Sequence, residues 1–549
     1  MKITLLVSAF NSLSQLVYIY LKERGDVVDV VYVNSASRNV ELENFTPELI
    51  LCPYLRDYLP ASVYEKYSTY IFHPGPKGDR GAYSLEAALN KKEWGVVILQ
   101  ANGLFDGGDI YAQKKFQVRQ TYKASLYRNE VLSSYATILD DFFENIADYK
   151  KEEQVLLPLN KDRKCKIDWQ NDTTNVILKK IYTYDSLPGI EDEILGIEVL
   201  LYGAWAEARL RGSLPKEIIA KRDGAICLAT VDGAIWITHL KEHGKFKLPA
   251  TYVLKERLQG IKEERLPLIF DKSYKTFYEI SCDIENEIAY LFFNFHNGAF
   301  SSDKCMKLKY AFEYIKTKVK VVVLMGGEDF FSNGIHLNLL EDSKKNGEDG
   351  WSNINAMNDL VKSVIFADDI ITVASLHKNA GAGGVFLALA CDYLLADENV
   401  ILNPHYKTLG LSGSEYHTYI LPKRVGIQKT EELLEACLPV GAIEAKRIGM
   451  VDRVFSDSDY MHEVQKFCEN IVVDEDKYSD FLWKKEDYLQ ENAQLIEQAR
   501  ENEIAIMHPE FWDETSQFHQ LRYEFVYKIC PRVTPARLKV NYKQGCKDA

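Results

Sequence analysis

The sequence predicts a multidomain α/β protein in which two strand–helix regions are separated by a smaller β-rich region. A chain of 549 residues is too long for one hydrophobic core, so several domains are expected. Strand and helix patterns alternate over the first 110 residues and again from about residue 273, which favours parallel sheets with crossover helices. Between them, two β-prone runs flank Asp232-Gly233, a strong hairpin signal.

The first region begins with an apolar run, Ile3 to Phe10, that predicts an opening strand. Asn11 is placed to cap the next helix and Gly25 to end it. Four more apolar runs predict strands at 27–33, 49–52, 70–73 and 96–99. His73 therefore lies at the carboxyl end of a strand, where sites in parallel sheets are found. From Tyr111 to about Asp172 the pattern predicts helices and a charged connector.

The remaining elements follow from the same patterns. The hairpin runs cover 225–230 and 234–238, and later apolar runs predict buried strands at 320–325 and 370–376 with a helix over 384–390. About the last 80 residues read as charged helices that give way to Pro531, Pro535 and a basic tail. The predicted domains are 1–150, 170–270 and 273–460, followed by a helical tail at 461–549.

Composition excludes several functional classes. The formal net charge is −14 without a dense basic block, which argues against a nucleic-acid partner. The ten cysteines form no CxxC pair and no zinc-like spacing with histidine, so we expect reduced thiols and no metal site. Neither a signal peptide nor an apolar stretch of roughly 20 residues is found, which predicts a cytoplasmic enzyme without a membrane segment.

A first set of motifs resembles folate-dependent formyltransferases. Formyl transfer passes through a tetrahedral intermediate, which needs oxyanion stabilisation and a base that moves protons. His73 matches the family's catalytic histidine, Arg80-Gly81 matches the end of its Leu-Pro/Arg-Gly loop, and Asp106 matches its aspartate. The resemblance implies catalytic roles for His73 and Asp106 and a folate-binding role for Arg80.

This segment departs from the family pattern at one position. The family's asparagine, two residues before the histidine, is Ile71 here, so an amide that would polarise the formyl oxygen is missing. Gln15 and Asn102 are the candidates to supply an amide from elsewhere and to contact folate.

A second set of motifs resembles the crotonase (enoyl-CoA hydratase) family. These enzymes hold an acyl thioester with two backbone N–H groups, one of them at a glycine-rich helix N-terminus. Matching Phe331 to His336 with the family's Phe-x-Ala-Gly-Ala-Asp places one donor at Ile335. Matching Ala382 to Phe386 with its Gly-Gly-Gly-Cys-Glu places the other at Gly383, beside Gly384. The resemblance implies that Ile335, Gly383 and Gly384 bind the coenzyme A thioester.

The acids that hydration requires are absent. The positions of the two hydratase carboxylates correspond to Phe386 and His405. Where the family has a Pro-Gly-x-Gly-Gly-Thr turn, this chain has titratable residues that include Glu415 and Tyr416. We therefore expect a repurposed site whose acid–base groups come from His405, Glu415 and Tyr416, with Tyr416 suited to the acid role at its ordinary pKa near 10.

Together, these segments resemble the HypX (HoxX) family of NiFe-hydrogenase maturation proteins. The resemblance implies a Rossmann-like formyltransferase domain, a small β-rich domain like the formyltransferase C-terminal domain, and a crotonase-fold coenzyme A domain with a helical C-terminal tail. It further implies that formyl passes from 10-formyl-tetrahydrofolate to coenzyme A, and that decarbonylation of formyl-CoA supplies the carbon monoxide ligand of the hydrogenase. Small-molecule substrates and NiFe-hydrogenase or its maturation chaperones are the implied partners.

Two other functions fit the same motifs. One is a formyltransferase that acts on a small amine and carries the crotonase region as a regulatory coenzyme A module. The other is a non-catalytic assembly factor that docks to hydrogenase. A simple enoyl-CoA hydratase ranks last because its acids are missing.

Overall fold

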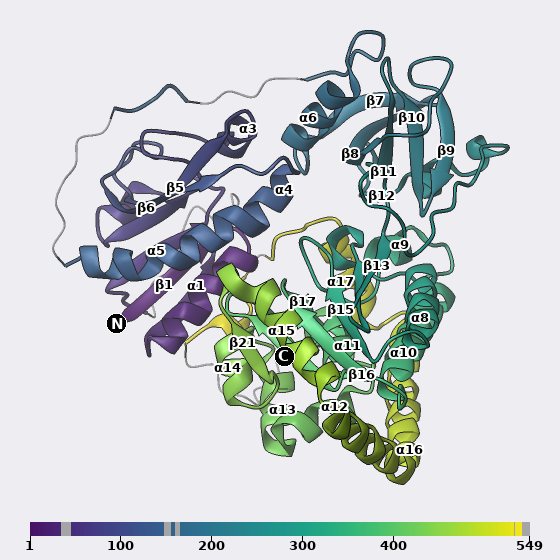
Figure 1. Cartoon of the computed structure of the whole chain (residues 1–549). Coiled ribbons are helices and arrows are strands. Elements are labelled where there is room, and N and C mark those ends of the chain that lie inside the picture. Colours follow the sequence, from purple (N-terminus) through teal and green to yellow (C-terminus); the bar gives the residue numbers. More distant parts are fainter. Residues whose placement is uncertain (34–44, 148–154, 160–164, 532, 541–549) are drawn as a thin grey trace. The chain divides into compact units, whose positions relative to one another are not determined.

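The computed structural model describes residues 1–33, 45–147, 155–159, 165–531 and 533–540 (Figure 1). These form two compact units. The first comprises Met1–Arg265, Lys272–Phe277 and the segment from Cys530, and the second comprises Leu266–Asp271 and Tyr278–Ile529. The second unit is therefore inserted into the chain of the first.

The first unit begins with a six-stranded sheet of order β2-β1-β3-β4-β5-β6. The strands are β1 (Lys2–Val7), β2 (Val27–Tyr32), β3 (Leu49–Tyr54), β4 (Thr69–His73), β5 (Glu93–Gln100) and β6 (Ile110–Gln117). The first four run parallel, whereas β5 is antiparallel to β4 and β6 is antiparallel to β5. The predicted strands are confirmed, and the expected parallel direction is wrong for β5.

A short connection explains the reversal at β5. Between β4 and β5 the chain forms one five-residue helix, α3 (Ser84–Ala88). Such a helix spans about 7.5 Å, whereas a five-residue strand spans about 16 Å, so α3 cannot carry the chain back along β4. The rest of this connection is the loop after His73, which contributes to the candidate site.

Residues 111–172 were predicted as helices and a connector, and the prediction is wrong for β6. Its polar stretch Gln113-Lys114-Lys115 has no apolar alternation because β6 is an edge strand with little buried surface. The next residues are helical: α4 (Lys123–Leu126), a π-helical turn (Tyr127–Val131) and α5 (Leu132–Asn145). Most of the predicted charged connector, 150–153 and 161–166, lies outside the described residues.

Capping fixes the helix after β1. In α1 (Ser12–Glu23) the Asn11 side chain accepts a hydrogen bond from the Ser14 amide at 3.1 Å. The chain leaves the helix through Gly25 at φ +82°, a left-handed conformation that glycine adopts without strain. Both predicted boundaries are confirmed.

The β-rich part of the first unit is an antiparallel sheet of order β7-β8-β11-β10-β9, with β12 paired to β11. Its strands are β7 (Ile190–Ile194), β8 (Ile197–Glu207), β9 (Ile218–Arg222), β10 (Ala225–Ala229), β11 (Ala234–Glu242) and β12 (Leu248–Pro249). The predicted hairpin is confirmed, with Ala229 opposite Ala234.

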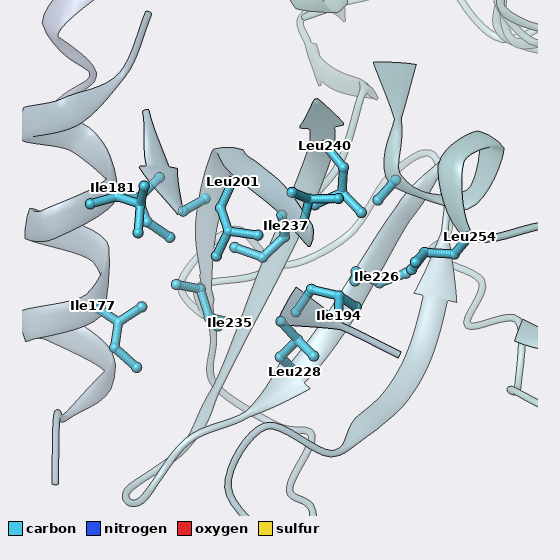
Figure 2. Packing of buried hydrophobic residues seen from close by; sticks show 14 of the residues in the cluster. Ile177, Ile181, Ile194, Leu201, Ile226, Leu228, Ile235, Ile237, Leu240 and Leu254 are labelled. Carbon is cyan, nitrogen blue, oxygen red and sulfur yellow. The ribbon is translucent and has the colours of Figure 1, made fainter. Parts of the chain in front are cut away.

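Helix α6 (Thr174–Tyr184) covers one face of this sheet (Figure 2). Ile177 and Ile181, four residues apart on the helix, are fully buried against Ile235, Ile237 and their neighbours. Each such isoleucine contributes roughly 1.5–3 kcal/mol relative to an exposed one.

The second unit is built on a six-stranded sheet of order β13-β14-β15-β16-β18-β21. Its strands are β13 (Ile280–Glu285), β14 (Ile288–Phe293), β15 (Val321–Gly326), β16 (Ile371–Leu376), β18 (Tyr393–Asp397) and β21 (Arg453–Phe455). All neighbours are parallel except β13 and β14. A smaller sheet joins β17 (Ala380–Gly381), β19 (Ile401–Asn403) and β20 (Val440–Gly441).

Helices surround these sheets. The remaining helices are α2 (Ala61–Tyr64) and α7 (Ala250–Leu254) in the first unit, and in the second unit α8 (Ser302–Lys316), α9 (Leu337–Asp342), α10 (Asn346–Ile365), α11 (Gly383–Leu389), α12 (His417–Val425), α13 (Ile427–Ala436), α14 (Ala442–Arg447), α15 (Tyr460–Val473), α16 (Glu475–Trp512) and α17 (Gln517–Val526). Helices α15 to α17 confirm the predicted helical tail, and α16 packs on α10 and α12 of the same unit.

The segment after α17 returns to the first sheet. The Tyr32 amide donates to the hydroxyl of Thr534 at 2.8 Å, and the Val540 amide donates to the Asp29 carboxylate at 2.9 Å. At the start of the chain, the amino group of Met1 pairs with Asp26 at 2.8 Å. Residues near the C-terminus therefore hold β2, and the N-terminal residue holds the turn that precedes it.

The nine cysteines among the described residues are free thiols. Within the described chain, no helix is both long enough and apolar enough to cross a membrane. No cluster of three or more His, Cys, Asp or Glu side chains suited to a metal ion occurs in the same residues.

Candidate active sites in the two units

In the first unit, two carboxylates flank the ring of His73. The ring ends β4 and is almost fully buried. Its Nε2 lies 2.9 Å from Oδ2 of Asp79, and its Nδ1 lies 3.4 Å from Oδ2 of Asp106. The structure thus brings together the predicted pair His73 and Asp106 and adds Asp79 on the opposite side of the ring.

Hydrogen bonds from Arg80 and Gly81 hold the loop that carries Asp106. The Gly81 amide donates to Oδ2 of Asp106 at 2.8 Å, and Nε of Arg80 donates to the Phe105 carbonyl at 2.6 Å. Asp106 itself has φ +47°, a left-handed conformation that is strained for a residue with a side chain. The Arg80-Gly81 turn therefore holds the aspartate toward the histidine.

Asn102 and Gln15, the two predicted substitutes for the missing asparagine, each form hydrogen bonds with backbone groups that are close to them in the sequence. The Asn102 side chain accepts from the Leu104 amide at 3.1 Å and donates to the Gly107 carbonyl at 3.4 Å, so it shapes an exposed turn. Gln15 on α1 donates through Nε2 to the Phe10 carbonyl at 3.0 Å. Their proposed contacts with folate stay predictions.

In the second unit, the loop before α9 and the N-terminus of α11 lie against each other. A methyl group added to Gly334 would lie 3.3 Å from the backbone nitrogen of Gly383. Neither Ile335 nor Gly383 donates its amide hydrogen to any acceptor in the described part of the chain. Each of the two predicted positions thus has an N–H group that no described acceptor uses, and Gly334, the residue before Ile335, lies close to Gly383, as an oxyanion hole built from these two loops requires.

Glycine is required where these loops meet. A methyl group on Gly384 would lie 2.3 Å from the Ser332 carbonyl oxygen, a distance at which the backbone must move. A methyl group on Gly381, which ends β17, would meet side-chain atoms alone, the amide oxygen of Asn333 at 3.2 Å and Cβ of Asn403 at 4.0 Å.

We expect Gly384→Ala to destabilise the protein by about 1–3 kcal/mol, because an overpacked contact with backbone cannot relax by a side-chain rotation. The loss will appear as a lowered unfolding temperature in calorimetry. Gly381→Ala is the matched control and should shift that temperature much less. Equal shifts for both variants would contradict the close packing of the two loops.

An aromatic group replaces the first hydratase acid. Phe386 on α11 is fully buried and stacks on Tyr406, with ring centroids 5.4 Å apart and planes at 13°. His405, at the position of the second acid, lies 3.4 Å through Nδ1 from the Thr408 hydroxyl. Neither position carries a carboxylate in this sequence, and the structure shows an aromatic stack at the first of them.

The carboxylate of Glu415 lies against Gly383, whose amide is one of the two predicted donors. A methyl group on Gly383 would lie 2.7 Å from the carboxyl carbon of Glu415. The side chain is 1% exposed, and the Tyr406 hydroxyl donates to its Oε2 at 2.6 Å. Burial raises the pKa of the Glu415 carboxyl to about 7, and the hydrogen bond from Tyr406 lowers that pKa only in part.

Tyr416 has a different set of charged neighbours. Its hydroxyl is buried near Arg500, with Glu497 and Asp359 also close enough to affect it. Burial raises the pKa of Tyr416 above its ordinary value, and the charge of Arg500 only partly opposes this. The condition under which Tyr416 was predicted as an acid, an unshifted pKa, is therefore not met.

Sequence reasoning missed two functional candidates. Asp79 is not among the residues matched to the formyltransferase motif, and its contact with His73 depends on a turn at Gly75, where a side chain would collide with both residues. Tyr406 is adjacent to His405 in the loop after β19, and nothing in the sequence of that loop gave a reason to prefer it. A buried tyrosine beside a lone carboxylate is a signal that appears only in three dimensions.

Comparison with known proteins matches two regions of the chain to known families. Residues 160–258 match the family model of the formyl transferase C-terminal domain, and residues 283–526 match that of enoyl-CoA hydratase/isomerase. The methionyl-tRNA formyltransferase of Pseudothermotoga lettingae is 27% identical over 206 residues, which cover 36% of this chain and 68% of that protein.

Two relatives extend over nearly the whole chain. The hydrogenase maturation factor HoxX of Bradyrhizobium diazoefficiens is 34% identical over 97% of this chain and 96% of its own length. The crystal structure of HypX from Aquifex aeolicus in complex with tetrahydrofolic acid is similar with a TM-score of 0.95 at 39% identity, and covers 100% of both chains. The chain therefore belongs to the HoxX/HypX family of hydrogenase maturation factors.

Proposed function

We propose that this chain synthesises the carbon monoxide that becomes a ligand of the NiFe-hydrogenase active site. The formyl group of 10-formyl-tetrahydrofolate passes to coenzyme A in the first unit, and formyl-CoA loses carbon monoxide in the second. Membership of a hydrogenase maturation family, together with a formyltransferase-like and a crotonase-like region, supports this assignment.

In the first step, a carbon–sulfur bond forms and a carbon–nitrogen bond breaks. The coenzyme A sulfur attacks the formyl carbon, the folate nitrogen leaves, and the thiol proton ends on that nitrogen. His73, between Asp79 and Asp106, is the proposed proton carrier because each ring nitrogen faces a carboxylate. Gln15, Arg80 and Asn102 are the proposed folate contacts, and the folate complex of the Aquifex aeolicus protein supports folate as the donor.

In the second step, formyl-CoA divides into carbon monoxide and free coenzyme A. The formyl carbon–hydrogen and carbon–sulfur bonds break, the sulfur takes the electron pair of the latter, and one proton moves from carbon to sulfur. The N–H groups of Ile335 and Gly383 would hold the thioester oxygen. Glu415, whose pKa is about 7, is protonated in a large fraction of molecules near neutral pH and can donate to the departing sulfur.

The observation that carries the proposal is the placement of the Glu415 carboxyl against Gly383. A buried acid at a thioester-binding N–H group is useful for protonating a thiolate. Hydration would instead need carboxylates at the positions of Phe386 and His405. The apolar Phe386–Tyr406 stack also limits the access of water, which would hydrolyse formyl-CoA to formate.

The test supplies the purified protein with 10-formyl-tetrahydrofolate labelled with carbon-13 in the formyl group, coenzyme A and deoxyhaemoglobin. We expect labelled carbon monoxide on haemoglobin in proportion to the tetrahydrofolate released, with coenzyme A needed but not consumed. Labelled formate or a formylated amine without carbon monoxide would favour the amine formyltransferase instead. No turnover by a protein that still supports hydrogenase maturation would favour a non-catalytic assembly factor.

A further inference from the structure

A second buried acid–base pair lies beside Glu415, formed by His417 at the start of α12 and Glu503 on α16. Nδ1 of His417 lies 3.2 Å from Oε1 of Glu503 and 3.1 Å from the Ser414 carbonyl oxygen. The side chain of Glu503 is 1% exposed, whereas that of His417 is 7% exposed. The carboxylate is therefore sealed inside the unit, and part of the imidazole is not.

These contacts determine which ring nitrogen of His417 carries hydrogen. Both groups that face Nδ1 are hydrogen-bond acceptors, so Nδ1 must be the donor. Neutral His417 then has an unprotonated Nε2, and this atom makes no hydrogen bond with any residue that the structure describes. A carboxylate that fixes Nδ1–H and leaves Nε2 as a base is the arrangement that activates histidine in hydrolytic triads.

The same carboxylate also shapes the loop that carries Glu415. Glu415 and Tyr416 have φ of +62° and +59°, so two consecutive residues with side chains are left-handed. Such a conformation costs roughly 1–2 kcal/mol per residue, and it persists only when neighbouring contacts fix it. Oε2 of Glu503 accepts from the Tyr416 amide at 2.9 Å, and Oε1 accepts from the Thr418 amide at 2.7 Å.

Aromatic contacts place the His417 ring beside Tyr406 and Phe386. Its centroid lies 5.4 Å from the ring of Tyr406, whose hydroxyl is bonded to Glu415, and 5.6 Å from the ring of Phe386. Phe386 occupies the position where the crotonase family has a catalytic acid. The imidazole therefore packs against Phe386, at the position of the missing acid, and against Tyr406, which binds the Glu415 carboxylate.

We infer that His417, oriented by Glu503, is the base that removes the formyl proton of formyl-CoA. This assignment rests on the proposed function and completes it, because loss of carbon monoxide needs one group that takes a proton from carbon and one that gives a proton to sulfur. Nε2 of His417 accepts the proton as the carbon–sulfur electron pair moves to sulfur, and Glu415 protonates the thiolate. Proton return from His417 to Glu415 restores both groups, so no external reactant is consumed. Glu503 is a positioning residue, since it acts by orienting the imidazole and by holding the backbone of the loop that carries Glu415.

The test uses the full-length protein with 10-formyl-tetrahydrofolate and coenzyme A, and measures formyl-CoA by mass spectrometry and carbon monoxide with haemoglobin. His417→Asn retains a side-chain N–H in place of Nδ1 and removes Nε2. We expect carbon monoxide release to fall on the order of 10²-fold or more, while formyl-CoA is still formed and accumulates. His462→Ala, at an exposed position on α15, is the matched control and should leave both rates unchanged.

The role of Glu503 is tested by coupling. We expect Glu503→Gln alone to slow carbon monoxide release at least tenfold, and to have a clearly smaller effect in the His417→Asn background, because the part of its effect that passes through the base is already absent there. Glu501→Gln, on an exposed position of the same helix, is the control.

Outcomes for this inference differ from those for the function itself. If the wild-type protein makes no carbon monoxide, the proposed function fails. If the wild type makes it and His417→Asn stays within twofold, or loses formyl-CoA formation in equal measure, the assignment of His417 as base is overturned. Multiplicative effects of the Glu503 and His417 substitutions would overturn the orienting role of Glu503.

Discussion

Glu415→Gln is expected to slow carbon monoxide release by about 10²–10⁴-fold. The same substitution is expected to make the protein more stable above neutral pH. Glutamine retains an oxygen that can accept from Tyr406 but cannot deliver a proton to a thiolate. Formyl-CoA should still form, because the transfer site lies in the other unit. The rate of haemoglobin carbonylation, compared with formyl-CoA by mass spectrometry, measures this effect.

The gain in stability follows from the direction of the pKa shift. Burial raises the pKa of Glu415 to about 7 in the folded protein, from 4.5 for a free glutamate. The unfolded chain therefore releases this proton first, and the free energy of unfolding falls as pH rises from about 4.5 to 7. Above that range the full penalty is present, on the order of 3 kcal/mol. Glutamine has no proton to lose and removes the penalty.

Thermal unfolding at pH 5 and pH 8 tests this second effect. The variant should unfold at a higher temperature than the wild type at pH 8 and at nearly the same temperature at pH 5. Glu510→Gln is a useful comparison, because burial also raises the pKa of Glu510 but hydrogen bonds from Ser412 oppose the shift. A gain for Glu415→Gln that is equal at both pH values would contradict the assignment of a buried, shifted carboxyl.

His73→Ala is the second substitution with a large expected effect, a loss of formyl transfer of about 10²–10⁴-fold. The reason is that His73 is the one imidazole placed between Asp79 and Asp106. Asp79→Asn and Asp106→Asn should each lower the rate less, since either leaves the ring with one carboxylate. Release of tetrahydrofolate, followed by absorbance, gives the rate.

Adding chemically prepared formyl-CoA distinguishes a specific loss of formyl transfer from damage to the rest of the protein. The His73→Ala protein should convert added formyl-CoA to carbon monoxide at the wild-type rate. His243→Ala, at an exposed position in the turn after β11, is the control for a lost histidine in the same unit. Transfer that survives in His73→Ala would contradict the role of His73, whereas loss of both reactions would indicate a general folding defect.

The sequence predicted those parts of the fold that depend on local patterns. Apolar runs identified β1 to β5, and the Asp232-Gly233 turn identified the β10–β11 hairpin. It missed β6, an edge strand with a polar sequence, and the antiparallel direction of β5, because strand direction depends on the path of a loop rather than on composition.

The candidate sites show the same division. His73, Asp106, Ile335 and Gly383 lie in short sequence motifs, and the structure brings His73 next to Asp106 and Gly334, the residue before Ile335, next to Gly383. Glu503 lies 85 residues beyond Thr418 in a helix that the sequence predicted only as part of a charged tail. A carboxylate in such a helix has the sequence signature of a solvated face, and its burial becomes evident only from tertiary contacts.

The return of residues 534–540 to the first sheet has a consequence for biosynthesis. The edge strand β2 receives contacts from Thr534 and Val540, so a growing polypeptide on the ribosome cannot complete this unit when its opening 265 residues have emerged. The inserted unit must be translated first, and a premature stop within it would leave the amino-terminal sheet without its closing segment. Truncated products should thus be degraded by cellular proteases more readily than the full-length protein, even when their first sheet is otherwise intact.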